Sequence, residues 1–403
     1  MIGGNGEAVG SPSLARLKLS ALDKTALPVV DGSSVAATSD NRARVAVFAK
    51  VVVAATLVLI FLGGLVTSWQ AGMAVPDWPL SFGSLNPHGW WENFPVRLEH
   101  GHRLFASCVG LAVTILCAWV WNDFLALGGA IGGSIILTTI AKFSGVPSLI
   151  VMHVSIWSMA GLFAALLLAR RRETALSSPV RWLCFAAFVG ICLQATLGGL
   201  RVTIETAGNV SVATAFRVFH GCVAQAELCV LVAAATLLSP RWQEPVRSPV
   251  SLPLRRLAWS LPVVVYLQLI VGATMRHLQV GLVIPTFPAA APNGSWLPTV
   301  HNAFVDLNFT HTRVGALAVT VLLVTVAISV LRKAPGEAPI AWTLLALVGI
   351  QVTLGVLVIW HTKPRTLTTF HVVNGALLLA TSLWLALRLS RTSNPSHSHE
   401  ATV

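Results

Sequence analysis

The chain has 403 residues, of which 55% are hydrophobic and 10% are charged. Soluble domains carry roughly 25% charged residues, so this composition excludes an ordinary soluble protein and indicates a polytopic membrane protein. The net charge of +12 does not indicate a nucleic-acid partner, because the basic residues form short clusters between apolar segments, as loops that set membrane topology do. The six cysteines all lie in apolar segments, so we expect buried thiols rather than a disulfide or a CxxC site.

Ten apolar segments approach the roughly 20 residues that a membrane-spanning helix needs. They cover about residues 45–67, 104–121, 124–141, 149–169, 182–200, 214–238, 257–275, 311–331, 340–360 and 368–387. Two thirds of the Lys and Arg residues fall on the side that carries both termini, which predicts a multi-pass protein of the lipid bilayer with cytoplasmic termini. Residues 1–44 contain no signal-peptide core and are predicted to form a flexible cytoplasmic tail, and residues 391–403 a second tail.

An internal repeat relates the two halves of the chain with a constant spacing of 209 residues. Five residues of the first copy recur in the second, with Gly63, Gly72, Pro76, Pro79 and His102 matched by Gly272, Gly281, Pro285, Pro288 and His311. A second unit, Gln-x-Thr-Leu-Gly, precedes His220 in the first half and His371 in the second. Each half therefore contains one histidine on its second helix and one on its fourth.

The predicted fold is all-α, with two pseudo-symmetric four-helix bundles at residues 45–240 and 241–390. The interval between the paired histidines is 118 residues in the first half and 60 in the second. The difference predicts a helical hairpin inserted in the first bundle at about residues 122–180. His153 lies in this insertion and is a rival to His220 as the partner of His102, although no Gln-x-Thr-Leu-Gly unit precedes it.

Glu99, His102 and Arg103 lie just before the second apolar segment, and we expect them in the first turn of its helix, at the membrane boundary. Residues three apart share a helical face, so Glu99 and His102 point the same way. Ionisable groups at membrane depth are costly and indicate a functional site. The alternative is an interfacial cluster whose side chains only reach lipid headgroups.

Four histidines on antiparallel helices at one depth are suited to providing axial ligands for heme. A single histidine in a membrane bundle would more simply form an interhelical hydrogen bond, but repeat-related positions favour ligation. The two halves differ: Asn308 stands at the position of Glu99, Thr312 at that of Arg103, and Arg313 is displaced by one residue. This asymmetry predicts one chemical site and one site that only holds a cofactor.

The motifs at Glu99–Arg103, at residues 76–79, at residues 198–202 and at residues 220–225 resemble the heme A synthase family. The resemblance covers residues 45–121 and 181–390. It implies an enzyme of the cell inner (plasma) membrane that oxidises the C8 methyl group of heme O to a formyl group. It also implies heme O synthase and cytochrome oxidase assembly proteins as partners.

Carried over by position, the resemblance implies that His102 and His220 ligate the substrate heme and that His311 and His371 ligate a heme b cofactor. It implies Glu99 as the catalytic carboxylate, acting as a base or stabilising positive charge. Arg103 is placed to pair with a heme propionate or with Glu99 itself. A cysteine pair found in some members of the family is absent between residues 69 and 98.

Two other functions remain open from the residues alone. A diheme b-type electron carrier would explain the four histidines equally well, but not a carboxylate in one half only. A transporter built from repeats would place polar residues at the membrane midplane, whereas here they gather at the outer ends of the helices.

Overall fold

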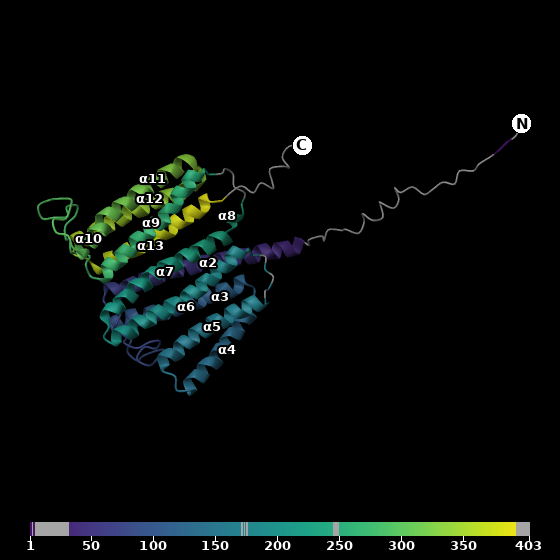
Figure 1. Ribbon diagram of the computed structural model, residues 1–403, viewed down its shortest axis with the longest axis horizontal. Helices are drawn as coiled ribbons and strands as arrows, with labels where there is room; N and C mark the ends of the chain where they lie inside the picture. The colour runs from purple at the N-terminus through teal and green to yellow at the C-terminus, as the bar shows by residue number, and fades with distance from the viewer. Residues whose placement is uncertain are drawn as a thin grey trace. The chain divides into compact units, whose positions relative to one another are not determined.

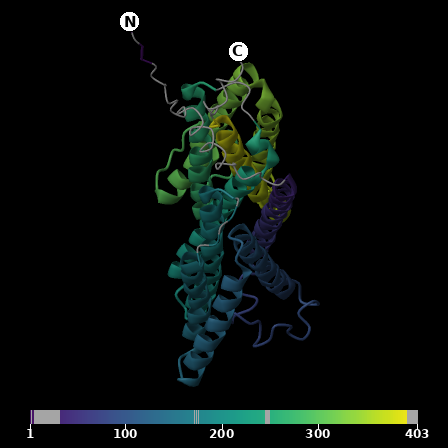
Figure 2. The same ribbon diagram turned by 90° about the vertical axis from the view of Figure 1, so that its right-hand side faces the viewer.

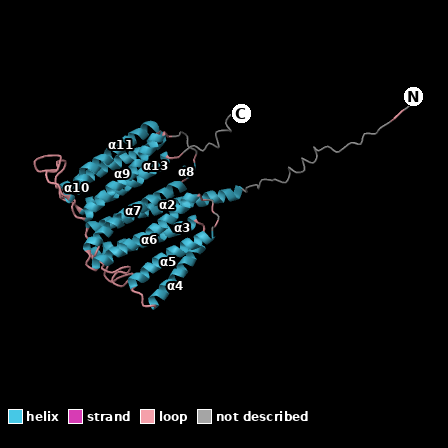
Figure 3. Cartoon of the chain, viewed as in Figure 1, coloured by secondary structure: helices cyan, strands magenta, loops and turns pink. Residues whose placement is uncertain are grey.

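The computed structural model describes residues 1, 3–4, 32–170, 172, 174, 176–244 and 250–391. These residues form two compact units, Met1–Arg42 and Ala43–Val403. The predicted all-α fold is confirmed, because 77% of the chain is helical and Figure 3 shows helices joined by loops, with no β-strand among the described residues. The predicted tails lie mainly outside the described residues, although the first described helix begins at Gly32.

Ten helices in the described part of the chain are long and apolar enough to cross a membrane, which confirms the predicted number of spans. They are α2 (Gly32–Ser68), α3 (Phe94–Val120), α4 (Phe124–Phe143), α5 (Ser148–Arg170), α6 (Ser178–Thr206), α7 (Val210–Leu238), α9 (Leu252–His277), the continuous segment of α10 (Ala303–Phe309), π-helix η1 (Thr310–Gly315) and α11 (Ala316–Lys333), α12 (Ala338–Trp360) and α13 (Arg365–Leu389). Two short elements, α8 (Pro240–Gln243) and the 3-10 helix η2 (Pro335–Glu337), lie between long helices.

The unit Ala43–Val403 contains two main hydrophobic cores. Helices α2 to α7 form the first, and α9, α11, α12 and α13 form the second. A smaller cluster joins them, in which Leu228 and Val232 of α7 lie with Ala376 and Leu383 of α13. Figures 1 and 2 both show the hairpin α4–α5 at the edge of this unit, away from the green and yellow helices of the second half.

The predicted inserted hairpin consists of α4 and α5, joined to α3 by a tight turn. Asn122 has a left-handed φ of 52°, and the Asp123 side chain then caps α4 by accepting a hydrogen bond from the backbone N–H of Ala126. The glycines of α4 do not interrupt the helix. A methyl group at Gly133 would lie 2.7 Å from Leu162 of α5, so this glycine lets the two helices pack closely.

Helices α3 and α10 begin earlier than their apolar segments predicted. The side chain of Asn93 caps α3, and the side chain of Asn302, which lies 209 residues later, caps α10. The expectation that Glu99 and His102 occupy the first turn is therefore wrong. Glu99 lies in the second turn of α3 and His102 in the third, which carries both side chains deeper into the bundle.

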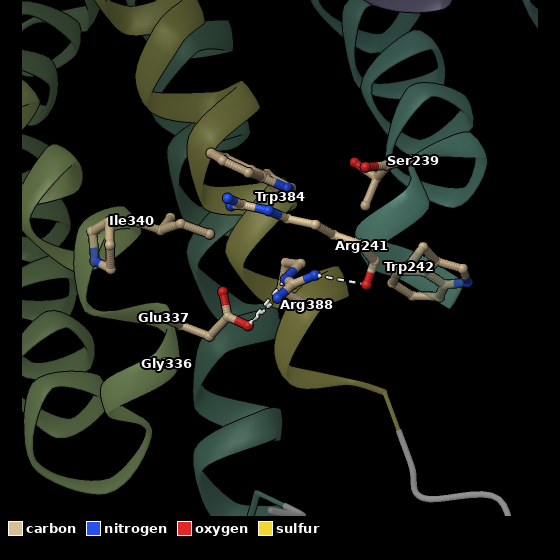
Figure 4. Close-up of a pocket in the computed structure, with 10 residues that line it drawn as sticks. Ser239, Arg241, Trp242, Gly336, Glu337, Ile340, Trp384 and Arg388 are labelled. Carbon is tan, nitrogen blue, oxygen red and sulfur yellow. Dashed lines mark hydrogen bonds and ion pairs between the residues drawn. The ribbon is translucent and has the colours of Figure 1, made fainter. Parts of the chain in front are cut away.

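Polar contacts also hold α8, η2 and the end of α13 together (Figure 4). Arg388 of α13 forms a 2.7 Å ion pair with Glu337 of η2 and donates a 3.2 Å hydrogen bond to the backbone oxygen of Arg241 in α8. At the opposite ends of the helices, Arg276 of α9 donates to the backbone oxygen of Gly64 and to Ser68 Oγ, both in α2. Arg276 thus joins the two halves at this end of the bundle.

Candidate functional site

Glu99 is the carboxylate of the predicted site, and only 1% of its surface is exposed. Its Oε2 accepts a 2.9 Å hydrogen bond from the backbone N–H of Val75. Its Oε1 lies 2.7 Å from the guanidinium of Arg103 and 3.4 Å from that of Arg201. Two guanidinium groups and a backbone donor thus contact the two carboxyl oxygens of Glu99 in the interior.

Arg103 fixes the outer loop above this carboxylate. Its guanidinium donates to the backbone oxygens of Val75, Asp77 and Leu80 at 2.9, 2.6 and 3.2 Å, in addition to its bond with Glu99. Of the two partners considered for Arg103, the structure shows Glu99. The side chain therefore positions both Glu99 and the loop that covers it.

Arg201 is a site residue that sequence reasoning did not single out. It lies on α6, 102 residues from Glu99, and also donates to the backbone oxygen of Gly72. A methyl group at Gly72 would lie 2.6 Å from this guanidinium, so the loop glycine makes room for it. The only sequence signal was its place in the motif at residues 198–202.

The four predicted histidine ligands share one packing arrangement. Each imidazole lies against a glycine of the preceding long helix, at a position where a methyl group would be 2.5 to 3.4 Å from the ring carbon Cε1. The pairs are Gly63 with His102, Gly198 with His220, Gly272 with His311 and Gly355 with His371. The glycines leave space for a ring at the same place on four helix pairs, which explains the recurrence of both residue types.

The spacing of His311 and His371 fits axial ligation of heme. Their ring centres are 6.3 Å apart. Metal–imidazole bonds of about 2 Å on both sides of an iron, with about 1 Å from each nitrogen to its ring centre, give about 6 Å. The side-chain amide of Gln351 lies 3.1 Å from Nε2 of His371, so this contact must break before that nitrogen can bind iron.

The first-half histidines present the same donor set. In each of the four histidines, Nδ1 is enclosed and has no hydrogen-bond partner among the described residues. None of the four Nε2 atoms is enclosed without a partner in this way. His102 and His220 also interact electrostatically with each other. Both halves therefore offer a pair of imidazoles whose Nε2 atoms suit an axial bond to iron.

Arg313 plays the role of Arg103 in the second half, although it is displaced by one residue from the position that the repeat gives. Arg313 donates to the backbone oxygens of Thr286 and Ala289, which lie 209 residues after Asp77 and Leu80. The π-helix η1 absorbs the one-residue displacement, because a π turn accommodates an extra residue within a helix. Arg313 thus holds its own outer loop as Arg103 does.

Asn308 occupies the position of Glu99 and changes its chemistry. It is completely buried, and its side-chain amide donates to the backbone oxygen of Val280. A neutral amide keeps a hydrogen bond to the loop but supplies no negative charge. The carboxylate with its two guanidinium partners is therefore a property of the first half.

His153 has a different environment from the four paired histidines. Its ring centre lies 5.9 Å from that of Trp78 in the first outer loop, and both of its nitrogens are enclosed without a hydrogen-bond partner. A methyl group at Gly199 of α6 would overlap the ring of Trp78. Trp78 therefore lies between α6 and the inserted hairpin, and His153 packs against it.

Positive charge accumulates at the outer ends of the helices near both histidine pairs. Arg201, Arg217, Arg276 and Lys363 all lie close enough to His277 to act on it electrostatically, and Lys363 lies in the turn between α12 and α13. Burial, and then the charge of Arg276, lowers the pKa of the Lys363 ammonium. Such an excess of cations suits anionic groups such as heme propionates.

No group of three or more His, Cys, Asp or Glu side chains in the described part of the chain could hold a metal ion alone. Axial ligation of heme needs only one or two side chains, because the macrocycle supplies the remaining ligands. The paired imidazoles are consistent with that type of metal centre.

Comparisons with known proteins agree with this geometry. A family model described as cytochrome oxidase assembly protein (COX15-CtaA) matches residues 13–157 and 96–383. The heme A synthase of Azorhizobium caulinodans is 25% identical over 368 residues, which cover 87% of this chain and 95% of the relative. The heme A synthase of Brucella ovis is 36% identical over 85 residues, which cover 19% of this chain and 24% of the relative.

Proposed function

Because the chain belongs to the cytochrome oxidase assembly protein family, we propose that it is a heme A synthase that oxidises the C8 methyl group of heme O to a formyl group. The observation that carries this proposal is the asymmetry between the halves. Both have a histidine pair and an arginine that holds the outer loop, but only the first has a buried carboxylate, Glu99, in contact with two guanidinium groups.

In this proposal the first half holds the substrate. His102 and His220 bind its iron, and Arg103 keeps Glu99 and the outer loop in place. Glu99 is the catalytic carboxylate. A carboxylate suits either of two roles, since it can accept a proton from the reacting methyl group or stabilise positive charge that develops there.

The second half holds heme b between His311 and His371. Heme b supplies one-electron redox chemistry when it is bound. Asn308 leaves this half without an acid or base at the position of Glu99, which is consistent with a site that holds a cofactor.

The protein is proposed to act in the cell inner (plasma) membrane with both termini in the cytoplasm. Its substrate, heme O, would come from a heme O synthase, and its product would pass to cytochrome oxidase assembly proteins. The family name supports the second partner.

Extraction of hemes from membranes of a host that makes heme O, with and without this chain, tests the proposal. Chromatography should show heme A only when the chain is present. Glu99→Gln and Glu99→Ala should abolish heme A while heme b stays bound. Glu92→Gln, which alters an exposed carboxylate of the same outer loop, should behave like the wild type.

A diheme electron carrier is the competing function, and the same experiment separates the two. A carrier would leave heme O unchanged in every variant, although the purified protein would still show a b-type spectrum. Production of heme A by Glu99→Ala at the wild-type rate would instead remove Glu99 from the catalytic role.

A further inference from the structure

Glu227 is a second buried carboxyl group in the first half, and the proposed reaction does not use it. It lies near the middle of α7 with 5% of its surface exposed. Its Oε1 atom is enclosed and has no hydrogen-bond partner among the described residues. An unsatisfied polar atom at membrane depth is costly and indicates a missing partner.

The surroundings of Glu227 favour its neutral form. Within the described structure, no Lys, Arg or His lies within ion-pair distance of it. Its ionisable neighbour is Cys192 of α6, whose thiol carries no positive charge in either state. A charged carboxylate without a cation is strongly disfavoured in such a place, so Glu227 is protonated and offers one O–H donor and one acceptor oxygen.

The position of Glu227 relates it to the substrate site. It follows His220 by seven residues, which places it on the same face of α7, about 10 Å further from the outer end. It faces Gly190 of α6, where a methyl group would overlap the carboxyl group. This contact repeats that of His220 with Gly198, two helical turns away.

The second half lacks this carboxyl group. Leu378 and Leu347 stand at the positions that correspond to Glu227 and Gly190 when His371 is aligned with His220 and the two Gln-x-Thr-Leu-Gly units with each other. An apolar pair thus replaces the carboxyl group and the glycine that it faces in the half assigned to heme b. The two histidine sites therefore differ at the level of Glu227, on the inner side of the histidines, as well as at the level of Glu99.

The chemical difference between heme O and heme B parallels this difference between the two halves of the protein. Heme O carries an apolar chain with a hydroxyl group next to the ring, where heme B has a vinyl group. The propionates lie on the opposite edge of the ring from this chain. With the propionates toward the cations at the outer ends of the helices, the hydroxyl group points inward, toward the level of Glu227.

We propose that Glu227 recognises the hydroxyl group of the hydroxyalkyl side chain of the substrate heme, and so selects heme O over heme B in the first half. The proposal rests on the proposed function, because it takes heme O as the substrate. A neutral, buried carboxyl group is a suitable partner for a single hydroxyl group. A site built to bond a hydroxyl group discriminates against analogues that lack it.

Binding of heme O and heme B by the purified full-length protein, loaded with heme b in its second half, tests the proposal by absorption titration. The wild type should prefer heme O. Glu227→Leu should weaken heme O binding about tenfold, since it leaves the buried hydroxyl group without a partner, and should leave heme B binding unchanged. Glu227→Gln should retain most of the preference, and Leu378→Ala, at the equivalent position of the second half, should not alter it.

A second measurement does not depend on the folding of Glu227→Leu. The infrared carbonyl band of the protonated carboxyl, identified by its loss in Glu227→Gln, should shift when heme O binds and not when heme B binds. The proposal is overturned if the wild type has no preference, if the band does not respond, or if Glu227→Leu weakens both hemes equally.

The two proposals fail in different ways. A Glu227-dependent preference for heme O without formation of heme A would overturn the proposed function alone. Formation of heme A by a protein whose Glu227→Leu variant still prefers heme O would overturn this inference alone.

Discussion

At the scale of single residues, the site depends on charges that are buried together. Arg103 and Arg201 both contact the buried carboxyl group of Glu99, and removing one partner from a buried ion pair is strongly disfavoured. Arg103 lies one turn along the same helix, at the i+4 position, whereas Arg201 comes from α6. The carboxylate is therefore oriented by two helices at once.

Replacement of Arg201 by Gln should lower the yield of heme A by roughly 10- to 100-fold, because small displacements of a catalytic group have effects of that order. Glu99 would keep Arg103 and Val75 but lose the partner that holds it toward α6. The check is heme A per bound heme b in extracted membranes. Arg256→Gln, which removes an exposed cation near the start of α9, is the control, and an equal loss in both variants would contradict a specific role for Arg201.

Alanine at the glycines that face the histidines should have effects ordered by distance. In Gly272→Ala the new methyl group would lie 2.5 Å from His311, so the ring must move, and overpacking of this kind costs about 1–3 kcal/mol. We expect most heme b to be lost. In Gly355→Ala, which faces the other proposed heme b ligand, the methyl group would lie 3.2 Å from His371, so a smaller displacement of the ring suffices and more heme b should be retained. Heme b per protein, from pyridine hemochrome spectra, measures both, and equal retention would refute the packing argument.

At the scale of elements, the two copies of the repeat use different helix geometries to place equivalent side chains at the same positions. The Asn caps at the starts of α3 and α10 put both histidines at the same depth. The extra residue of the second copy would rotate Arg313 away from its loop in a regular α-helix, by about 100°. The π turn of η1 prevents this rotation and keeps Arg313 on Thr286 and Ala289.

Deletion of Thr312 should therefore be tolerated. It makes His311 and Arg313 adjacent, as His102 and Arg103 are, and removes the reason for the π turn. We expect a regular helix, heme b content close to that of the wild type and a change in unfolding free energy within about 1 kcal/mol. Loss of heme b after this deletion would show instead that the π turn itself shapes the histidine site.

At the scale of the whole molecule, the number of spans constrains the topology. An even number of membrane-spanning helices places both ends of the chain on one side, and ten are present in the described residues. The bias of Lys and Arg predicts that this side is the cytoplasm. The outer loops over Glu99 and Asn308 then face away from the cytoplasm.

Reporter fusions test this topology. A green fluorescent protein at either terminus should be fluorescent, and alkaline phosphatase at either terminus should be inactive. Phosphatase inserted in the exposed loop between residues 291 and 301 should be active. An active phosphatase at the C-terminus would mean that one of the ten helices does not cross the membrane.

The amino-acid sequence by itself determined the ten spans, the repeat and the four paired histidines with Glu99. These features depend on local hydropathy and on spacing along one chain, which carry over directly into helices and their order. The starts of α3 and α10 could also have been read from Asn93 and Asn302, because a side-chain cap acts on its own helix. The apolar pattern concealed them, because the polar stretches at residues 97–103 and 306–313 separate these first turns from the long apolar segments.

Only the tertiary structure decided which distant side chains meet. Arg201 reaches Glu99, Trp78 lies between α6 and the hairpin, and Glu227 faces Gly190, and each of these contacts depends on how helices rotate and slide against one another. Hydrophobic periodicity defines the buried face of a helix but not the register of its neighbour, because many registers bury a similar apolar area. The side chains that pack between the helices select one register, and with it the chemistry of the site.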